Sequence, residues 1–96
     1  MAGPLCILAT ITPRSEHLAD ARDAIVGIVE RTCAEPGCQT FRLLEGPDGR
    51  LRLYEEWDDE AALEAHHAED YTRAVFAAYE GWLATPPEIV HLQRLA

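Results

Sequence analysis

Two residues with the chemistry of an acid–base pair, Glu55 and His66, lie close together in the second half of the chain. Glu55 falls within residues 51–57, where alternate positions of a strand share one face, and the other members of that face are two leucines and Trp57. A carboxyl group on such an apolar face must find a hydrogen-bond donor or be neutralised. The nearest candidates in sequence are His66 and His67, in the helix predicted to follow.

Only one of two adjacent helical residues can point inward. Leu63 is the clear inward residue of this helix, and His66 follows it by three positions, so His66 stacks on the same face while His67 lies at the edge. We therefore expect Glu55 to fix the tautomer and orientation of His66, which would act as a base or hydrogen-bond donor in an apolar pocket. The alternative is a structural role, in which both side chains lie at a wet edge or His66 merely satisfies Glu55.

Other catalytic constellations are poorly represented. The only serine, Ser15, stands at the start of a predicted helix, where it is expected to be an N-cap and not a nucleophile. The cysteines form no CxxC pair and are expected to be reduced and mostly buried: Cys6, Cys33 and Cys38. The histidines show no metal-ligand spacing, so we expect no metal site: His17, His66, His67 and His91.

The elements that position these residues can be predicted from hydrophobic periodicity and turn chemistry. Residues 5–12 are apolar and partly β-branched, as in a strand covered on both faces, and an amphipathic helix is expected from Ser15 to just before Pro36. Residues 38–45 and 51–57 form a hairpin around a Pro-Asp-Gly turn.

The last third of the chain is predicted to be two helical stretches and a strand. Asp58 and Asp59 are placed to cap the first stretch, which runs through His67. After a break near Asp70 the helical period resumes, and Pro86 and Pro87 end it before a strand over residues 89–95.

The resulting β-α-β-β-α-β order is the ferredoxin-like α+β arrangement, in which four antiparallel strands carry the helices on one face. With 96 residues there is room for one domain, spanning residues 1–96. Alternate positions on both sides of the first and last strands are apolar, so the face of the sheet without helices must also be covered. A second copy of the chain is the simplest candidate, and we expect a homodimer.

Charge narrows the possible partners. The formal net charge is −9, and the eight basic residues are dispersed along the chain. This argues against binding to nucleic acid or to an anionic membrane surface. No segment approaches the roughly 20 apolar residues that span a bilayer, and no basic region precedes the first apolar stretch, so we expect a cytoplasmic protein.

Three motifs, at their usual spacings, resemble the antibiotic biosynthesis monooxygenase (ABM) family: Glu-Pro-Gly-Cys at 35–38, Leu-Tyr-Glu-Glu-Trp at 53–57, and Glu-Ala-Ala-Leu-Glu-Ala-His at 60–66. The resemblance implies a dimeric α+β barrel with one cavity per subunit between sheet and helices. It also implies oxidation of quinol- or anthrone-type compounds by O₂ without flavin, haem or metal. Such chemistry needs an apolar pocket, a base and donors for the developing charge.

Within the family, the residues favour one branch. Trp57 matches the tryptophan that lines the anthrone oxidase cavity, but Leu53 and Leu63 stand where that branch has polar residues. The haem-degrading branch is disfavoured, because the chain has no Asn, and His66 and Phe76 stand about where that branch has Trp and His. His66 with Glu55 resembles the quinol monooxygenase-like group.

We therefore expect a cofactor-independent monooxygenase acting on a quinol, anthrone or similar electron-rich aromatic molecule, with O₂ as co-substrate. His66 would be the base and Glu55 its orienting partner, and the substrate would contact Trp57, Leu53, Leu63 and Phe76. Two alternatives remain open from the sequence: an isomerase- or cyclase-like enzyme acting on a small carbonyl compound, and a small-molecule-binding dimeric module without turnover.

Overall fold

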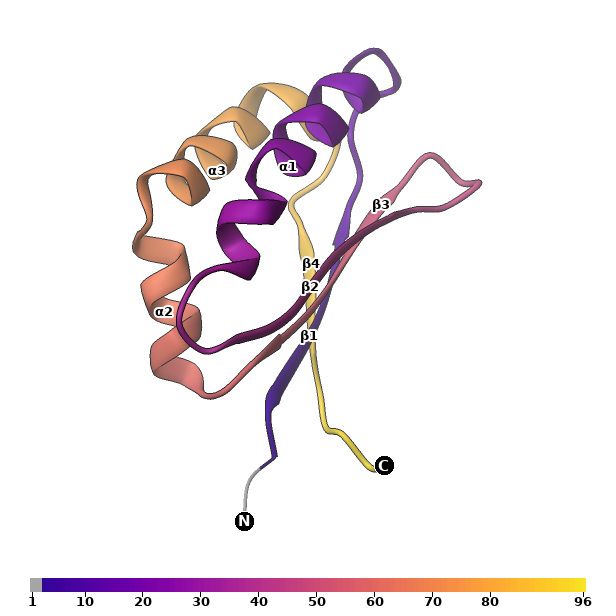
Figure 1. Ribbon diagram of the computed structural model, residues 1–96. Helices are drawn as coiled ribbons and strands as arrows, with labels where there is room; N and C mark the ends of the chain where they lie inside the picture. Colours follow the sequence, from indigo (N-terminus) through magenta and orange to yellow (C-terminus); the bar gives the residue numbers. More distant parts are fainter. Residues whose placement is uncertain (1–2) are drawn as a thin grey trace.

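The computed structural model describes residues 3–96, so the first two residues of the expected 1–96 domain lie outside it. A four-stranded antiparallel sheet, in the order β2-β3-β1-β4, carries all three α-helices on one face (Figure 1). The elements run in the order β1 (Leu5–Ile11), a short 3₁₀ turn (Ser15–His17), α1 (Leu18–Cys33), β2 (Cys38–Glu45), β3 (Leu51–Trp57), α2 (Glu60–Ala68), α3 (Asp70–Trp82) and β4 (Glu88–Leu92). The predicted ferredoxin-like α+β class is confirmed.

The helix starts differ from expectation at one place. Ser15 is not an N-cap, because the chain enters α1 through the 3₁₀ turn that Ser15 begins, and no side chain caps either start. Asp59 does cap α2, accepting a hydrogen bond from the backbone N–H of Ala62 at 2.9 Å. The predicted break lies at Glu69, whose extended backbone separates α2 from α3.

Two further expectations need correction. The last strand ends at Leu92, three residues earlier than predicted, and Arg94 beyond it forms an ion pair with Glu56 of β3. The three cysteines are free, as expected, but they are not mostly buried: Cys6 is buried, Cys38 is half-buried and Cys33 is exposed near the end of α1.

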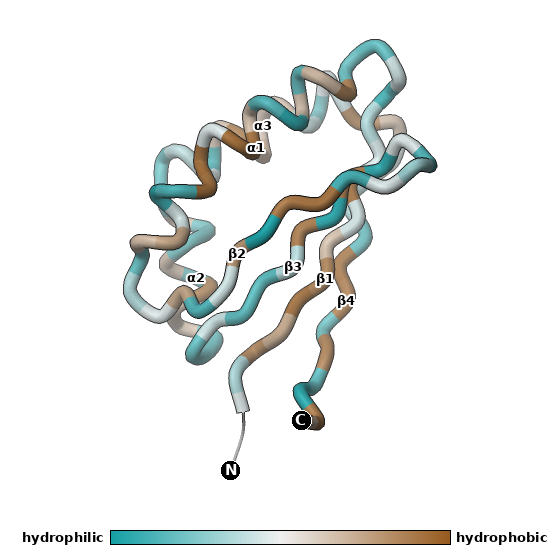
Figure 2. Tube along the Cα trace, turned by 45° about the vertical axis from the view of Figure 1, so that its right-hand side comes forward, coloured by the Kyte–Doolittle hydropathy of each residue, from teal (hydrophilic) through white to brown (hydrophobic). Residues whose placement is uncertain are grey.

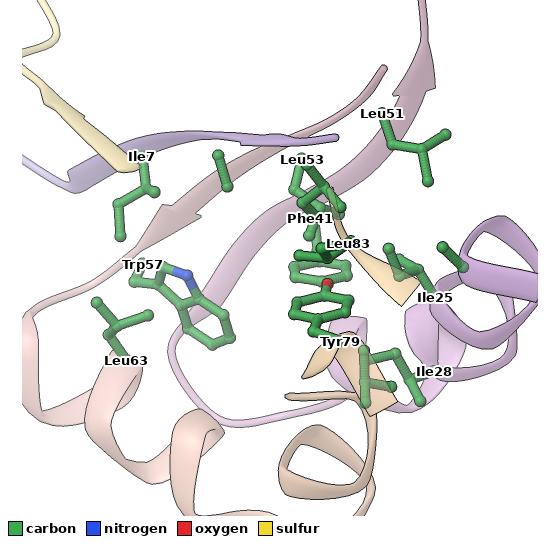
Figure 3. Close-up of a cluster of buried hydrophobic side chains, with 14 residues drawn as sticks. Ile7, Ile25, Ile28, Phe41, Leu51, Leu53, Trp57, Leu63, Tyr79 and Leu83 are labelled. Atoms are coloured by element: carbon green, nitrogen blue, oxygen red, sulfur yellow. The ribbon is translucent and has the colours of Figure 1, made fainter. Parts of the chain in front are cut away.

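The core lies between the sheet and the helices (Figure 3). Cross-strand pairing places Ile11 opposite Leu51, and both side chains are fully buried. The helices contribute Ile25 and Ile28 from α1 and Tyr79 from α3. The strand phase predicted from Trp57 is correct, because the buried side chains of β3 on this face are those of Leu51, Leu53, Glu55 and Trp57.

The other face of the sheet carries no helix (Figure 1). Leu8 of β1 pairs with Val90 of β4 on this side, and Figure 2 shows how hydrophobic these two neighbouring strands are. Val90 and Leu92 are 42% and 43% exposed. The expected apolar character of this face is therefore present. Among residues 3–96, no helix is long and apolar enough to cross a membrane.

The turn after α1 is tightly packed against α2. Gly37 has a φ of +84°, and a Cβ added there would lie 2.6 Å from the Cβ of Ala62. The carbonyl of Gly37 also accepts a hydrogen bond from the N–H of Asp58 at 2.8 Å. This close approach brings the start of β2 beside the helix that carries His66.

Gly37→Ala should therefore destabilise the fold through two separate costs. The left-handed backbone costs a non-glycine residue about 1–2 kcal/mol, and the clash with Ala62 adds about 1–3 kcal/mol of overpacking. Gly49→Ala is the matched control, because Gly49 also has a positive φ, +75°, but nothing lies within 4 Å of its added Cβ. Urea unfolding should show the larger loss for Gly37→Ala; equal losses would contradict the packing account.

Candidate functional site

A cavity of about 340 Å³ lies between the helices and the helix-facing side of the sheet. Its wall is almost entirely apolar and includes residues from all four strands and all three helices. Five of the six residues predicted for the site line this cavity: Leu53, Glu55, Leu63, His66 and Phe76. A cavity of this size and character is typical of a small-molecule site.

His66 is held among aromatic side chains in the wall. Its side chain is 4% exposed, and its ring lies 4.8 Å from the indole of Trp57 and 5.5 Å from the ring of Phe41, measured between centroids. Nδ1 is 2.9 Å from Oε2 of Glu35 and 3.4 Å from the hydroxyl oxygen of Thr72. The ring is therefore fixed in position by packing against two aromatic rings and by polar contacts at one nitrogen.

The partner of His66 is thus Glu35 and not Glu55, which corrects the pairing expected from the sequence. Glu55 instead accepts a hydrogen bond at Oε1 from the indole N–H of Trp57, at 2.9 Å. The two side chains emerge on the same face of β3, two residues apart, and this local contact meets the need for a donor. Glu35 was quoted in a motif, but its position in a turn gave no signal that it would reach α2, 31 residues away.

Glu35 is itself held by a second donor. The hydroxyl of Tyr71, at the start of α3, donates a hydrogen bond to the same Oε2 atom that contacts His66. The guanidinium of Arg31 lies 4.5 Å above the ring of Tyr71, in cation–π contact. The side chain of Glu35 is about one-tenth exposed. This carboxylate is therefore a fixed acceptor that joins α1, α2 and α3.

The contact with Glu35 decides which nitrogen of His66 can take up a proton. A carboxylate only accepts hydrogen bonds, so Nδ1 carries the hydrogen and Nε2 of the neutral ring is the acceptor. Within residues 3–96, Nε2 has no hydrogen-bond partner, and no fully enclosed side-chain nitrogen or oxygen lacks one. Nε2 therefore borders the cavity that His66 lines, with its lone pair available.

The second carboxyl group of the site, Glu55, is 7% exposed. Burial raises the pKa of this group above its ordinary value, while the N–H of Trp57 and the charge of His66 oppose the rise. The sequence prediction that this carboxyl enters an apolar space is correct. Glu55 and His66 therefore interact through charge, since a positive charge on His66 favours the ionised form of Glu55.

Trp57 does not have the position expected for it. We expected it to line the pocket in contact with substrate, but it is fully buried and is not part of the cavity wall. Strand alternation correctly places its side chain on the helix-facing side, but it does not reveal that α2 covers it. Trp57 instead supports two wall residues, His66 through ring packing and Glu55 through its hydrogen bond.

In the exposed part of the wall, Phe76 was predicted from the sequence, but His67 and His91 were not. Phe76, 46% exposed, and His67 pack edge to face at 5.5 Å, and His91 of β4 lines the same cavity from an exposed position. Burial, followed by the neighbouring charge of His66, lowers the pKa of His67. His91 pairs with Ile7 and so lies on the helix-facing side, a position that alternation along β4 could have revealed. No group of three or more His, Cys, Asp or Glu in the described chain could hold a metal ion.

Glu55→Gln should change how stability depends on pH. Because burial raises the pKa of Glu55 in the folded protein, the unfolded chain loses this proton first as pH rises, and the wild type loses stability from about the unfolded pKa up to the folded one. The Gln variant lacks this loss, so its free energy of unfolding relative to wild type should increase between about pH 4 and pH 7, by about 1.4 kcal/mol per unit of pKa difference. Urea unfolding at both pH values measures this.

The exposed Glu64 of α2 supplies the control, since Glu64→Gln removes the same charge without touching a buried carboxyl group. A pH-dependent change of equal size in the two variants would contradict the assignment to burial of Glu55.

Comparison with known proteins places the chain in a family. The sequence matches the antibiotic biosynthesis monooxygenase family over residues 4–78. Rv0793 of Mycobacterium tuberculosis, which is named as a proposed monooxygenase, is 30% identical over 91 residues, covering 94% of this chain and 89% of the relative. Its solved structure has a TM-score of 0.91 at 26% identity, with 98% of this chain and 97% of that chain covered.

A second solved structure, PA3566 from Pseudomonas aeruginosa, has a TM-score of 0.92 at 30% identity and covers 100% of this chain and 98% of its own. The fold, the three motifs and the sequence match agree. The chain belongs to the antibiotic biosynthesis monooxygenase family.

Proposed function

We propose that the protein is a monooxygenase that oxidises a quinol, an anthrone or a similar electron-rich aromatic molecule with O₂ and without a bound cofactor, and that His66 is its general base. The observation that carries this proposal is the setting of His66. Its Nδ1–H is bound to Glu35, and Nε2 borders an apolar cavity of about 340 Å³. A neutral imidazole fixed in this way can take a proton from a bound hydroxyl or activated C–H group.

Besides a base, this reaction requires few other catalytic groups from the protein. Removing a proton from such a substrate yields an anion rich enough in electrons to reduce O₂ itself. For an anthrone-type CH₂ group the overall change is CH₂ + O₂ → C=O + H₂O, in which the carbon is oxidised and both oxygen atoms are accounted for. The apolar wall, including Leu53, Leu63 and Phe76, would exclude water and pack against the aromatic rings.

The two carboxyl groups would have different roles. Glu35 is a positioning residue, because it fixes the tautomer of His66 from the side away from the cavity. Glu55 lines the cavity, and its negative charge would stabilise the imidazolium that forms when His66 takes up a proton. Trp57 would act through both, by holding Glu55 and supporting the ring of His66.

Oxygen uptake by the metal-free apoprotein, measured against a panel of quinols and anthrones and corrected for the spontaneous rate, tests this function. Loss of the base in His66→Ala should lower turnover by roughly 10²–10⁴-fold. The melting temperature should stay near that of wild type. The free energy of unfolding should fall by no more than about 1–2 kcal/mol, because Glu35 loses one of its donors. Glu35→Gln should give a smaller loss of turnover with an altered pH profile, because it keeps an acceptor but removes the charge.

His91→Ala is the matched control, because it removes an imidazole from the exposed part of the same cavity. It should cost much less turnover than His66→Ala. Equal rates in wild type and His66→Ala, on a substrate that the wild type oxidises, would refute the mechanism. Proton exchange or isomerisation of a small carbonyl compound without oxygen uptake would favour an isomerase- or cyclase-like enzyme, and binding without any turnover would favour a binding module.

We also propose that two copies pair through the face of the sheet that the helices leave open. Leu8, Val90 and Leu92 form an apolar strip there, while Glu56 is bound by Tyr54 and Arg94 on the same side. Burying this strip against a second copy would remove it from water and leave the cavity on the outer side of each subunit.

Sedimentation at micromolar concentration should show a homodimer, and Val90→Asp should weaken it by placing a charge in the apolar strip. Val26→Asp is the control, because Val26 is 57% exposed on α1, away from the sheet. A well-folded wild-type monomer would refute the pairing, as would equal weakening by the two variants.

A further inference from the structure

Tyr79 is the one tyrosine of the described residues 3–96 whose hydroxyl lacks a hydrogen-bond partner. Tyr54 donates to Glu56 at 3.0 Å, and Tyr71 donates to Glu35. Tyr79 is 8% exposed and lies in the apolar core, as Figure 3 shows, with its ring extending from α3 between the helices and the sheet. Buried tyrosine hydroxyls normally find a partner, so this one needs an explanation.

The side chain of Tyr79 borders the cavity, and its hydroxyl is not enclosed. Tyr79 lines the cavity wall, and no side-chain oxygen that is fully enclosed lacks a hydrogen bond in the part of the chain that the structure describes. An unpartnered hydroxyl oxygen must therefore have open space beside it. The hydroxyl is available to a bound molecule without any rearrangement of the core.

Tyr79 lies along the cavity from His66. Thr72, whose hydroxyl is 3.4 Å from Nδ1 of His66, precedes Tyr79 by seven residues in α3. Seven residues correspond to about two helical turns, or roughly 10 Å along the axis. Long helical side chains lean toward the N-terminus of their helix, so we expect the Tyr79 hydroxyl to point back along the cavity toward the His66 end.

The chemical character of this hydroxyl is that of a donor. Burial, followed by the negative charge of Glu55, raises the pKa of Tyr79 above its ordinary value, so the group keeps its proton throughout the physiological range. Around it the wall is apolar, with Phe76 at 5.8 Å between ring centroids. A hydrogen bond made there to a ligand oxygen would be shielded from competing water.

We propose that Tyr79 is a ligand-binding residue that donates a hydrogen bond to a second oxygen of the bound aromatic molecule, while a first oxygen lies at Nε2 of His66. The site then favours rings that carry two oxygen substituents over rings that carry one. This inference deepens the proposed function. The position of the first oxygen, at Nε2 of His66, rests on that function, whereas the hydrogen bond from Tyr79 affects ligand binding and does not require any reaction with O₂.

Binding under nitrogen tests the inference, with two probes that differ at one position: naphthalene-1,4-diol and 4-methyl-1-naphthol, in which a methyl group replaces one hydroxyl. Calorimetric titration of the wild type should show tighter binding of the diol. Tyr79→Phe should weaken diol binding by roughly 3–10-fold, the value of one neutral hydrogen bond, and leave the affinity for 4-methyl-1-naphthol unchanged. Tyr54→Phe, which removes a hydroxyl on the opposite face of the sheet, should change neither affinity.

Several results would overturn the inference. One is a preference for the diol of the same size in wild type and Tyr79→Phe. Another is an equal loss of affinity for both probes in Tyr79→Phe, which would mean that Tyr79 has a structural role. The third is no binding of the diol by the folded wild type. Oxygen uptake is compared separately between wild type and His66→Ala, so failure of the Tyr79 inference can be told apart from failure of the proposed function. A preference that depends on Tyr79 without any oxygen uptake would leave the ligand site standing and remove the monooxygenase.

Discussion

The hydrogen bond between Glu35 and His66 is the interaction on which the architecture of the site depends. It joins the turn after α1 to α2 across 31 residues of sequence, and Tyr71 adds α3 to the same carboxylate oxygen. All three helices therefore meet at one acceptor. Because this acceptor lies behind the imidazole, it fixes the ring without occupying the nitrogen that borders the cavity.

This junction requires the backbone to come unusually close to α2. Gly37, in the turn after α1, has a left-handed backbone conformation, and the Cβ of any other residue there would clash with Ala62. Asp59 then starts α2 at the right place by capping the N–H of Ala62. The Glu-Pro-Gly-Cys motif can thus be understood physically: its glutamate holds the histidine, and its glycine lets the strand and the helix approach closely enough for that contact.

The sequence was sufficient for the features that depend on local rules. Alternation along β3 correctly predicted that Glu55 lies on the face of the buried leucines. Helical spacing from Leu63 correctly predicted that His66, and not His67, points into the core. It failed where a contact depends on how distant elements meet. Glu35 reaches His66 only because α2 packs on the turn at Gly37, and Trp57 is covered because α2 lies over the end of β3. Neither fact follows from periodicity. The hydrogen bond from the Trp57 indole N–H to Glu55 was not predicted, because His66 was expected to be the partner of Glu55.

The polar groups of this site are difficult to explain by stability alone. Glu35, Glu55 and His66 are each nine-tenths or more buried, among residues that otherwise form a continuous apolar core. Well-packed apolar side chains often stabilise a fold as well as a buried polar cluster does, and a buried carboxyl with a raised pKa costs stability at neutral pH. Here Glu55 and His66 line one cavity, and Glu35 lies behind the histidine. Within residues 3–96, Nε2 of His66 and the hydroxyl of Tyr79, whose side chain lines the same cavity, have no hydrogen-bond partner. Such an arrangement is expected where a fold gives up stability for a functional site, and it agrees with the small-molecule site proposed above.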